Sequence, residues 1–173
     1  MKYPLRSVIV VGATSGIGRA VVEKLAKEGV RVGIAGRRED RLLELQQRFG
    51  TERISYRIMD VTKDSATVAL DELLEEVGAP DALLYASGIG KQNPTLEEAM
   101  ELRTVETNCM GMVRIVDHFI NYVKRTPAYD TRHKAHIAVI TSVACVVGGC
   151  ALHVVDEVVD DANHAHAVCL HGA

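Results

Sequence analysis

Short apolar runs alternate with amphipathic segments over the first 142 residues, and this alternation constrains the fold more than any other feature. The apolar runs, rich in β-branched and small residues, occupy 7–13, 30–36, 54–61, 81–88 and 136–142. Near-continuous apolar runs of this length are typical of strands that are buried on both faces. The pattern therefore predicts five strands of a parallel sheet.

The segments between these runs carry an apolar residue every three or four positions, which is the periodicity of a helix. Gly29, Gly50 and Gly78 follow three of them as typical C-terminal stops. The expected core positions are Ile17, Val21 and Leu25; Leu42, Leu45 and Phe49; Leu70, Leu73, Leu74 and Val77; and Val105, Cys109, Met112, Val116, Phe119 and Val123. This order predicts an α/β fold, a doubly wound parallel sheet in a three-layer sandwich, truncated after about the fifth strand.

The composition of the chain is that of a soluble globular protein. Its 173 residues suit one folding unit, with 47% apolar and 25% charged residues. The net charge of −3 and the lack of a basic stripe give no reason to expect a nucleic-acid partner. Four cysteines without a C-x-x-C pair, and no secretory signal, favour reduced thiols and a cytoplasmic location.

The stretch 137–155 raises the question of a membrane span, since His153 is its only acidic, basic or imidazole side chain. Gly148 and Gly149 interrupt it, and a spanning helix needs about 20 predominantly apolar residues. We therefore expect no membrane span.

A glycine-rich turn, "VVGATSGIGRA" at 10–20, joins the first strand to the first helix. Gly12, Gly16 and Gly18 permit a tight turn, close approach of the backbone to a phosphate, and close packing of helix on strand. The helix N-terminus offers unpaired N–H groups and a positive dipole to a pyrophosphate. In this context the turn predicts a Rossmann-like dinucleotide site, with tight packing alone as the alternative.

The second strand ends in Gly36-Arg37-Arg38, where an NAD site usually has an acidic residue for the ribose hydroxyls. A guanidinium at this point pairs with a 2′-phosphate, so the sequence favours NADP(H) over NAD(H). Two solvated arginines at the start of a helix remain the alternative.

Five motifs, in order and spacing, resemble those of the short-chain dehydrogenase/reductase family. They are "GATSGIG" (12–18), preceded by Val11 where threonine is usual, "MDV" (59–61), "YASG" (85–88), "ETNCMG" (106–111) and "VITS" (139–142). The resemblance covers about residues 5–143. It implies hydride transfer between a nicotinamide and a small carbonyl or alcohol substrate.

The resemblance also implies roles for individual residues. It implies pyrophosphate binding by the glycine turn, 2′-phosphate binding at the arginine pair, adenine binding at "MDV", a cofactor bed at "YASG", and a catalytic serine and asparagine. The cofactor residues are Gly12, Thr14, Ser15, Gly16, Ile17, Gly18, Arg37, Arg38, Asp60, Val61, Ala86, Ser87 and Gly88, and the catalytic residues are Ser142 and Asn108. Simpler roles stay open: a turn cap for Asp60, a helix-surface amide for Asn108 and an ordinary strand end for Ser142. No metal site is expected.

The Tyr-x-x-x-Lys pair of the family, which supplies the proton and holds the nicotinamide ribose, is absent. Val155 and Val159 occupy the corresponding positions, and neither tyrosine nor lysine occurs after Lys134. We therefore expect an NADP(H)-dependent oxidoreductase whose turnover is absent or impaired. The alternative is a non-catalytic dinucleotide-binding or interaction protein. The segment 96–125 resembles the dimer helix of the family, which leaves a homodimer open.

The last segment does not continue the family pattern, so we expect a nucleotide-binding domain over 1–143 and a separate tail over 144–173. Either a shifted reading frame or a natural inactive paralogue explains this tail. An apolar helical face of Leu152, Val155, Val159 and Ala162 is the favoured structure, and metal binding by Cys150, His153, His164, His166, Cys169 and His171 is an alternative. A sheet that ends at its fifth strand also predicts an exposed, association-prone edge.

Overall fold

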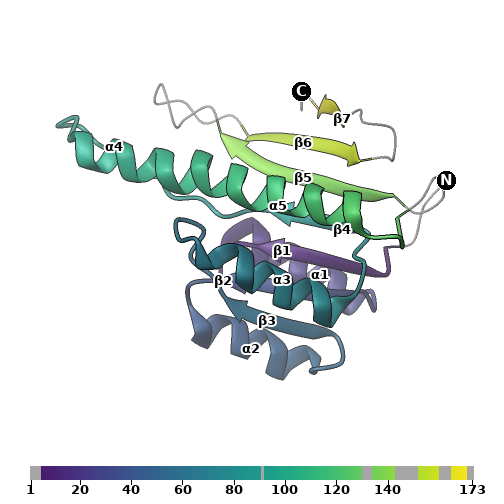
Figure 1. The fold of residues 1–173 in the computed structure, drawn as a ribbon. Coiled ribbons are helices and arrows are strands. Elements are labelled where there is room, and N and C mark those ends of the chain that lie inside the picture. Colours follow the sequence, from purple (N-terminus) through teal and green to yellow (C-terminus); the bar gives the residue numbers. More distant parts are fainter. Residues whose placement is uncertain (1–4, 91, 130–133, 143–151, 160–164, 171–173) are drawn as a thin grey trace.

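The computed structural model describes residues 5–90, 92–129, 134–142, 152–159 and 165–170. A single sheet forms its centre (Figure 1). The strands are β1 (Ser7–Val11), β2 (Arg31–Gly36), β3 (Ile54–Ile58), β4 (Ala82–Tyr85), β5 (Ala135–Ser142), β6 (Leu152–Val159) and β7 (Ala165–Leu170). Their spatial order is β3-β2-β1-β4-β5-β6-β7, and the first five run parallel.

The helices are α1 (Gly16–Lys27), α2 (Glu39–Phe49), α3 (Ser65–Val77), α4 (Glu98–Val105), the π-helical turn η1 (Glu106–Met110) and α5 (Gly111–Arg125). They cover both faces of the sheet, as the alternation along β1 shows. Val8 and Val10 belong to one core with α1 and α2, whereas Ile9 and Val11 belong to a second core with α3 and α5. The parallel, doubly wound sheet predicted from the sequence is confirmed.

The buried face of α1 differs by one position from the expected face. Gly18, Val22 and Ala26 are buried, whereas the side chain of Ile17 is 48% exposed. Gly18 packs against the backbone of Gly12 in the loop after β1, and this contact sets the rotation of α1. Only a residue without a side chain can come so close to that backbone. The faces expected for α2 and α3 are confirmed, since Leu42, Leu45 and the four positions in α3 lie in the core.

The longest helix is interrupted by η1, which the periodicity did not predict. Phe119 and Val123 are buried as expected, but Val105 is 48% exposed and Cys109 also lies at the surface. A π turn accommodates one extra residue, so the apolar face before it is rotated relative to the face after it. Thr107, and not Cys109, is the buried residue of the turn.

The tail forms strands where we expected a helix, so that expectation was wrong. β6 pairs antiparallel with β5 over their full lengths, and β7 pairs antiparallel with β6. Four of the eight residues of β6 are valines, whose branched side chains favour strand over helix. The expectation of an exposed edge at β5 was also wrong, because β6 pairs with that edge.

Two expectations for the tail fall outside the described positions. Of the residues considered as metal ligands, Cys150, His164 and His171 lie outside the described residues, and only the backbone of the other three is described. Ala162, from the expected helical face, also lies outside. Among the helices of the described ranges, none combines the length and apolar character needed to cross a membrane.

Candidate functional site

The carboxyl ends of β1, β2, β3 and β4 meet at one edge of the sheet, and the loops that follow them bring the candidate residues together. Gly12 begins the loop after β1 with a φ of 95°, a conformation that favours glycine. The N–H groups of Gly12 and Ala13 both donate to the carbonyl of Ala35, at 2.9 and 3.0 Å. The turn is thus fastened to the end of the neighbouring strand β2.

Gly12 and Gly18 bring three backbone segments into contact. A Cβ on Gly12 would lie 2.5 Å from the backbone of Ala86 and Ser87, and one on Gly18 would lie 2.3 Å from the carbonyl oxygen of Gly12. Both distances are too short for a side chain, so glycine is required at both positions. The loops after β1 and β4 and the first turn of α1 form one compact base.

Gly16 has a different environment from its two neighbours in the motif. Its φ is 55°, and a Cβ placed there would meet nothing within 4 Å. It begins α1, so the N–H groups of Gly16, Ile17 and Gly18 have no acceptor within the helix. The space above Gly16 and these N–H groups together suit an anionic phosphate.

Arg38 extends over this turn from the end of β2. Its guanidinium donates to the Thr14 hydroxyl at 2.8 Å through Nη2 and to the Ser15 hydroxyl at 2.7 Å. A Cβ on Gly36 would lie 2.6 Å from the Thr14 side chain, so the two loops touch. Arg37 lies exposed beside them. The structure therefore brings a positive charge to the rim of the glycine turn.

Asp60 follows β3 at the same edge and begins a tight turn. Its Oδ1 accepts hydrogen bonds from the N–H and the hydroxyl of Thr62, at 3.1 and 2.8 Å, and its carbonyl accepts from the N–H of Lys63 at 3.0 Å. Burial raises the pKa of Asp60, but the hydrogen bonds from Thr62 and the charges of Arg37 and Lys63 outweigh it, so the pKa is lowered overall. The carboxylate is therefore ionised and can accept a hydrogen bond.

The loop after β4 is held from two sides. The N–H of Ala86 donates to the carbonyl of Val11 at 2.7 Å, which joins the loop to β1. The side-chain amide of Asn108 accepts from the N–H of Ile89 and donates to the carbonyl of Ile89, each at 2.8 Å. Ser87 is half-buried and Gly88 exposed. Asn108 thus fixes the loop expected to form the cofactor bed.

This arrangement agrees with the comparison against known families. A family model described as short chain dehydrogenase matches residues 6–154. The chain belongs to the short-chain dehydrogenase family.

Similar proteins with this short-chain dehydrogenase fold include one curated oxidoreductase and two solved structures. An uncharacterised oxidoreductase of Staphylococcus saprophyticus is 26% identical over 140 residues, which cover 79% of this chain and 54% of the relative. An actinorhodin polyketide ketoreductase with NADPH has a TM-score of 0.61 at 28% identity, over 66% of this chain and 46% of that one.

The second structure, a serine dehydrogenase complexed with NADP+, has a TM-score of 0.64 at 25% identity, over 80% of this chain and 54% of that one. The chain spans only a little more than half the length of the curated relatives that it matches.

The remaining catalytic candidate of this short-chain dehydrogenase, Ser142, lies at the carboxyl end of β5, the edge that carries the other loops. Only its backbone is described. Val155 and Val159, at the Tyr and Lys positions of the family, lie in β6 opposite Val139 and Ala135. Because β6 runs antiparallel, Val159 is at the far end of the sheet from the glycine turn. Neither residue is on a helix that faces the site.

Two contacts at the site were not foreseen from the sequence of this short-chain dehydrogenase. The buried Tyr85 donates from its hydroxyl to the carbonyl of Thr107 at 3.1 Å, and burial raises the pKa of this phenol, which keeps it protonated. Arg114 donates to the carbonyl of Val61 at 2.7 Å. The first contact joins η1 to β4, and the second joins α5 to the turn after β3. Neither contact left a signal in the pattern of apolar residues.

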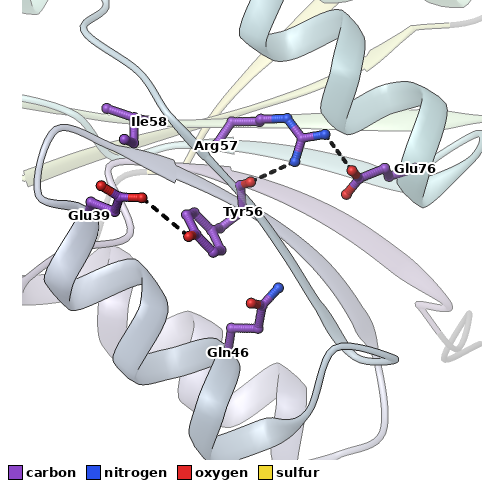
Figure 2. A pocket seen from close by; sticks show the side chains of 6 residues that line it. All are labelled: Glu39, Gln46, Tyr56, Arg57, Ile58 and Glu76. Carbon is purple, nitrogen blue, oxygen red and sulfur yellow. Dashed lines mark hydrogen bonds and ion pairs between the residues drawn. The ribbon is translucent and has the colours of Figure 1, made fainter.

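A pocket of about 530 Å³ lies away from the glycine turn, at the outer edge of β3 (Figure 2). It is lined by Glu39, Gln46, Tyr56, Arg57, Ile58 and Glu76. Two of these side chains bond to the free edge of the strand: Gln46 donates to the carbonyl of Ile54 and Arg57 to that of Tyr56, each at 2.8 Å. Arg57 also pairs with Glu72 and Glu76. These contacts shield an edge strand against pairing with another chain.

Within the described positions, no three side chains of His, Cys, Asp or Glu come together as a metal site would require.

Proposed function

We propose that this chain binds NADP(H) at the carboxyl edge of its sheet and is the nucleotide-binding part of an oxidoreductase for small carbonyl or alcohol substrates. The observation that carries the proposal is the position of Arg38. Its guanidinium bonds to Thr14 and Ser15, directly beside the N–H groups that begin α1. Phosphate oxygens of a bound dinucleotide would be held by these N–H groups and this charge.

The preference for NADP(H) is supported by the end of β2. Gly36 is followed by two arginines, where a site for NAD(H) would have a carboxylate as the acceptor for the ribose hydroxyls. Arg37 is exposed at the end of β2 and Arg38 bonds to Ser15, so either guanidinium group would be available to pair with a 2′-phosphate. Two similar solved structures contain NADPH and NADP+.

The residues present fit the cofactor. Gly12 and Gly18 form a base that any Cβ would disrupt, and the open space over Gly16 leaves room for the pyrophosphate. The ionised Asp60 would accept a hydrogen bond from the amino group of adenine, and Asn108 would hold the bed loop beneath the cofactor. The bound nicotinamide would give or accept the hydride of the reaction.

Cofactor titration tests the proposal. NADPH and NADH are titrated by their fluorescence against the wild type and against Arg37→Asp, Arg38→Asp and the control Arg31→Asp. Arg31 is an exposed arginine at the other end of β2, so the control has the same charge change on the same strand. We expect tighter binding of NADPH, a preference reversed or abolished by changes at 37 and 38 and retained by the control. Equal affinities in the wild type would overturn the preference, and no binding of either nucleotide would overturn the proposal.

A second candidate function, non-catalytic binding of the dinucleotide, is favoured by the position of Val155 and Val159 in β6. Two valines supply neither the phenol that transfers the proton nor the ammonium group that assists it. The two candidates share the binding site and differ only in turnover.

Self-association is also part of the proposal. Leu102, Val105, Met110 and Val113 are exposed by 61, 48, 50 and 47% along α4, η1 and α5. This apolar surface lies within 96–125, the segment whose resemblance to the dimer helix of the family left a homodimer open. Sedimentation of the wild type and of Val113→Glu tests it, with a dimer that dissociates in the variant as the expected result. A monomeric wild type would contradict it.

A further inference from the structure

Arg114 connects α5 to the turn after β3. Its Nη1 donates to the carbonyl of Val61 at 2.7 Å, and its side chain is 24% exposed. Two carboxylates lie farther from it, Asp64 at 3.9 Å and Glu106 at 3.7 Å. The hydrogen bond to Val61 is therefore its shortest polar contact among the described residues.

The carbonyl of Val61 needs such a partner because of the turn in which it lies. Residues 60–63 form a tight turn closed by the bond from the N–H of Lys63 to the carbonyl of Asp60. In a turn of this kind the carbonyl of the second residue points outward, without a partner inside the turn. Val61 is 4% exposed, so an unpaired carbonyl there would be costly. Arg114 satisfies it.

The same helix turn holds the side chain of Val61 as well. A Cβ on Gly111 would lie 2.7 Å from Val61 Cγ2, so Val61 packs directly on the bare backbone of α5. Arg114 lies three residues later, on the same face of the helix. Val61 is thus held at its carbonyl and at its side chain, while Thr62 holds the carboxylate of Asp60.

We propose that Arg114 is a positioning residue for recognition of the adenine base, acting through the Asp60–Val61 turn. This rests on the proposed function, in which Asp60 accepts from the adenine amino group. Arg114 itself would not touch the nucleotide. It fixes the orientation of the turn, so that the carboxylate of Asp60 meets the base in one geometry.

The test compares two nucleotides that differ only at the base: NADPH and its deamino analogue, in which hypoxanthine replaces adenine and lacks the amino group. The ratio of their dissociation constants measures recognition of the base. Arg114→Met removes the donor, and Gly111→Ala displaces Val61 through the other contact. Arg125→Met is the matched control, because Arg125 donates to the carbonyl of Asn121 within α5 and lies at its far end.

We expect the wild type and Arg125→Met to prefer NADPH over the deamino analogue. Arg114→Met should weaken NADPH binding by about tenfold, as for the loss of one charged hydrogen bond, and bring the ratio close to one. Gly111→Ala should lower the ratio in the same direction. General destabilisation of the protein would weaken the binding of both nucleotides equally, so the ratio of their dissociation constants would not change.

The outcomes separate this inference from the proposed function. If the wild type binds neither nucleotide, the proposed function fails. If it binds both and a folded Arg114→Met or Gly111→Ala keeps the wild-type ratio, the role of Arg114 is overturned. A wild type that binds both equally well overturns it too. If Arg114→Met does not fold, the ratio for Gly111→Ala decides.

Discussion

Gly18 lies so close to Gly12 that a Cβ on Gly18 would be 2.3 Å from the carbonyl oxygen of Gly12. The same Cβ would lie 3.3 Å from the side chain of Ala86. The first turn of α1 therefore rests on the loops after β1 and β4 at one point. The fold and the candidate cofactor site both depend on this contact between Gly18 and Gly12.

Gly18→Ala should therefore destabilise the protein and impair nucleotide binding together. The added methyl group meets backbone that cannot move without shifting the turn, so we expect a loss of about 2 to 3 kcal/mol in the free energy of unfolding. Urea unfolding measures it. A midpoint equal to that of the wild type would show that the turn is looser than described.

Gly16→Ala and Gly78→Ala form a matched pair that separates binding from stability. Both glycines have positive φ, 55° and 83°, and open space where a Cβ would be. Each substitution should cost about 1 kcal/mol, because alanine is strained in this conformation. Only Gly16 lies at the start of α1, so only Gly16→Ala should weaken NADPH binding. Equal affinities in the two variants would exclude phosphate binding above Gly16.

Most of the fold could be predicted because buried strands produce near-continuous runs of apolar residues in the sequence. The five parallel strands were placed to within a few residues, and the cores of α2 and α3 were predicted correctly. Ile17 was misplaced because the periodicity of α1 allows two faces. The choice between them depends on the contact of Gly18 with Gly12, which is tertiary. The π turn at Asn108 likewise leaves no trace in apolar spacing.

The motifs predicted which residues belong to the candidate site, but not their contacts. The glycine turn, the arginine pair and Asp60 lie at one edge of the sheet, and their roles in binding a cofactor stay a prediction. The bonds of Arg38 to Thr14 and Ser15, and of Asn108 to Ile89, depend on loop conformation, which residue types do not determine. The prediction of a helix in the tail failed because β6 contains four valines, whose β-branched side chains pack well in strands.

Asn108→Ala should loosen the loop after β4. It removes two hydrogen bonds of 2.8 Å to the backbone of Ile89, which leaves a half-buried N–H and carbonyl without the amide. We expect a loss of about 1 to 3 kcal/mol in the free energy of unfolding. Asn121→Ala, at an exposed position of α5, is the control. Equal unfolding midpoints for the two variants would contradict a clamping role for Asn108.

Glu76 gives the protein a specific sensitivity to acid. The hydrogen bond from Arg57 lowers its pKa below the ordinary 4.5, and burial opposes this only in part. Because the folded pKa is the lower one, the contribution of Glu76 is present above pH 4.5 and is lost as the pH falls through the folded value. The side chain is 41% exposed, so solvent screening limits the effect to less than about 1 kcal/mol.

Glu76→Gln should therefore be less stable than the wild type at pH 7 and should lose less stability below pH 4.5. Urea unfolding at a series of pH values measures both differences. Parallel pH profiles for the two proteins would show that the pair with Arg57 contributes nothing.

Turnover should be absent, or at least about 100-fold lower than in a relative with the Tyr-x-x-x-Lys pair, the low end for a positioned proton donor. Val155 and Val159 supply neither group, and β6 directs the chain away from the site. NADPH oxidation with a panel of small ketones measures it. Rapid reduction that Ser142→Ala abolishes would point to another acid and favour the catalytic candidate.

Amide hydrogen exchange with and without NADPH is the most direct measurement of dinucleotide binding at the carboxyl edge of the sheet. We expect slower exchange at 12–18, 60–62 and 86–89, and no change at 78–82, at the opposite edge of the sheet. Protection confined to the pocket beside β3, or no protection at saturating NADPH, would contradict it.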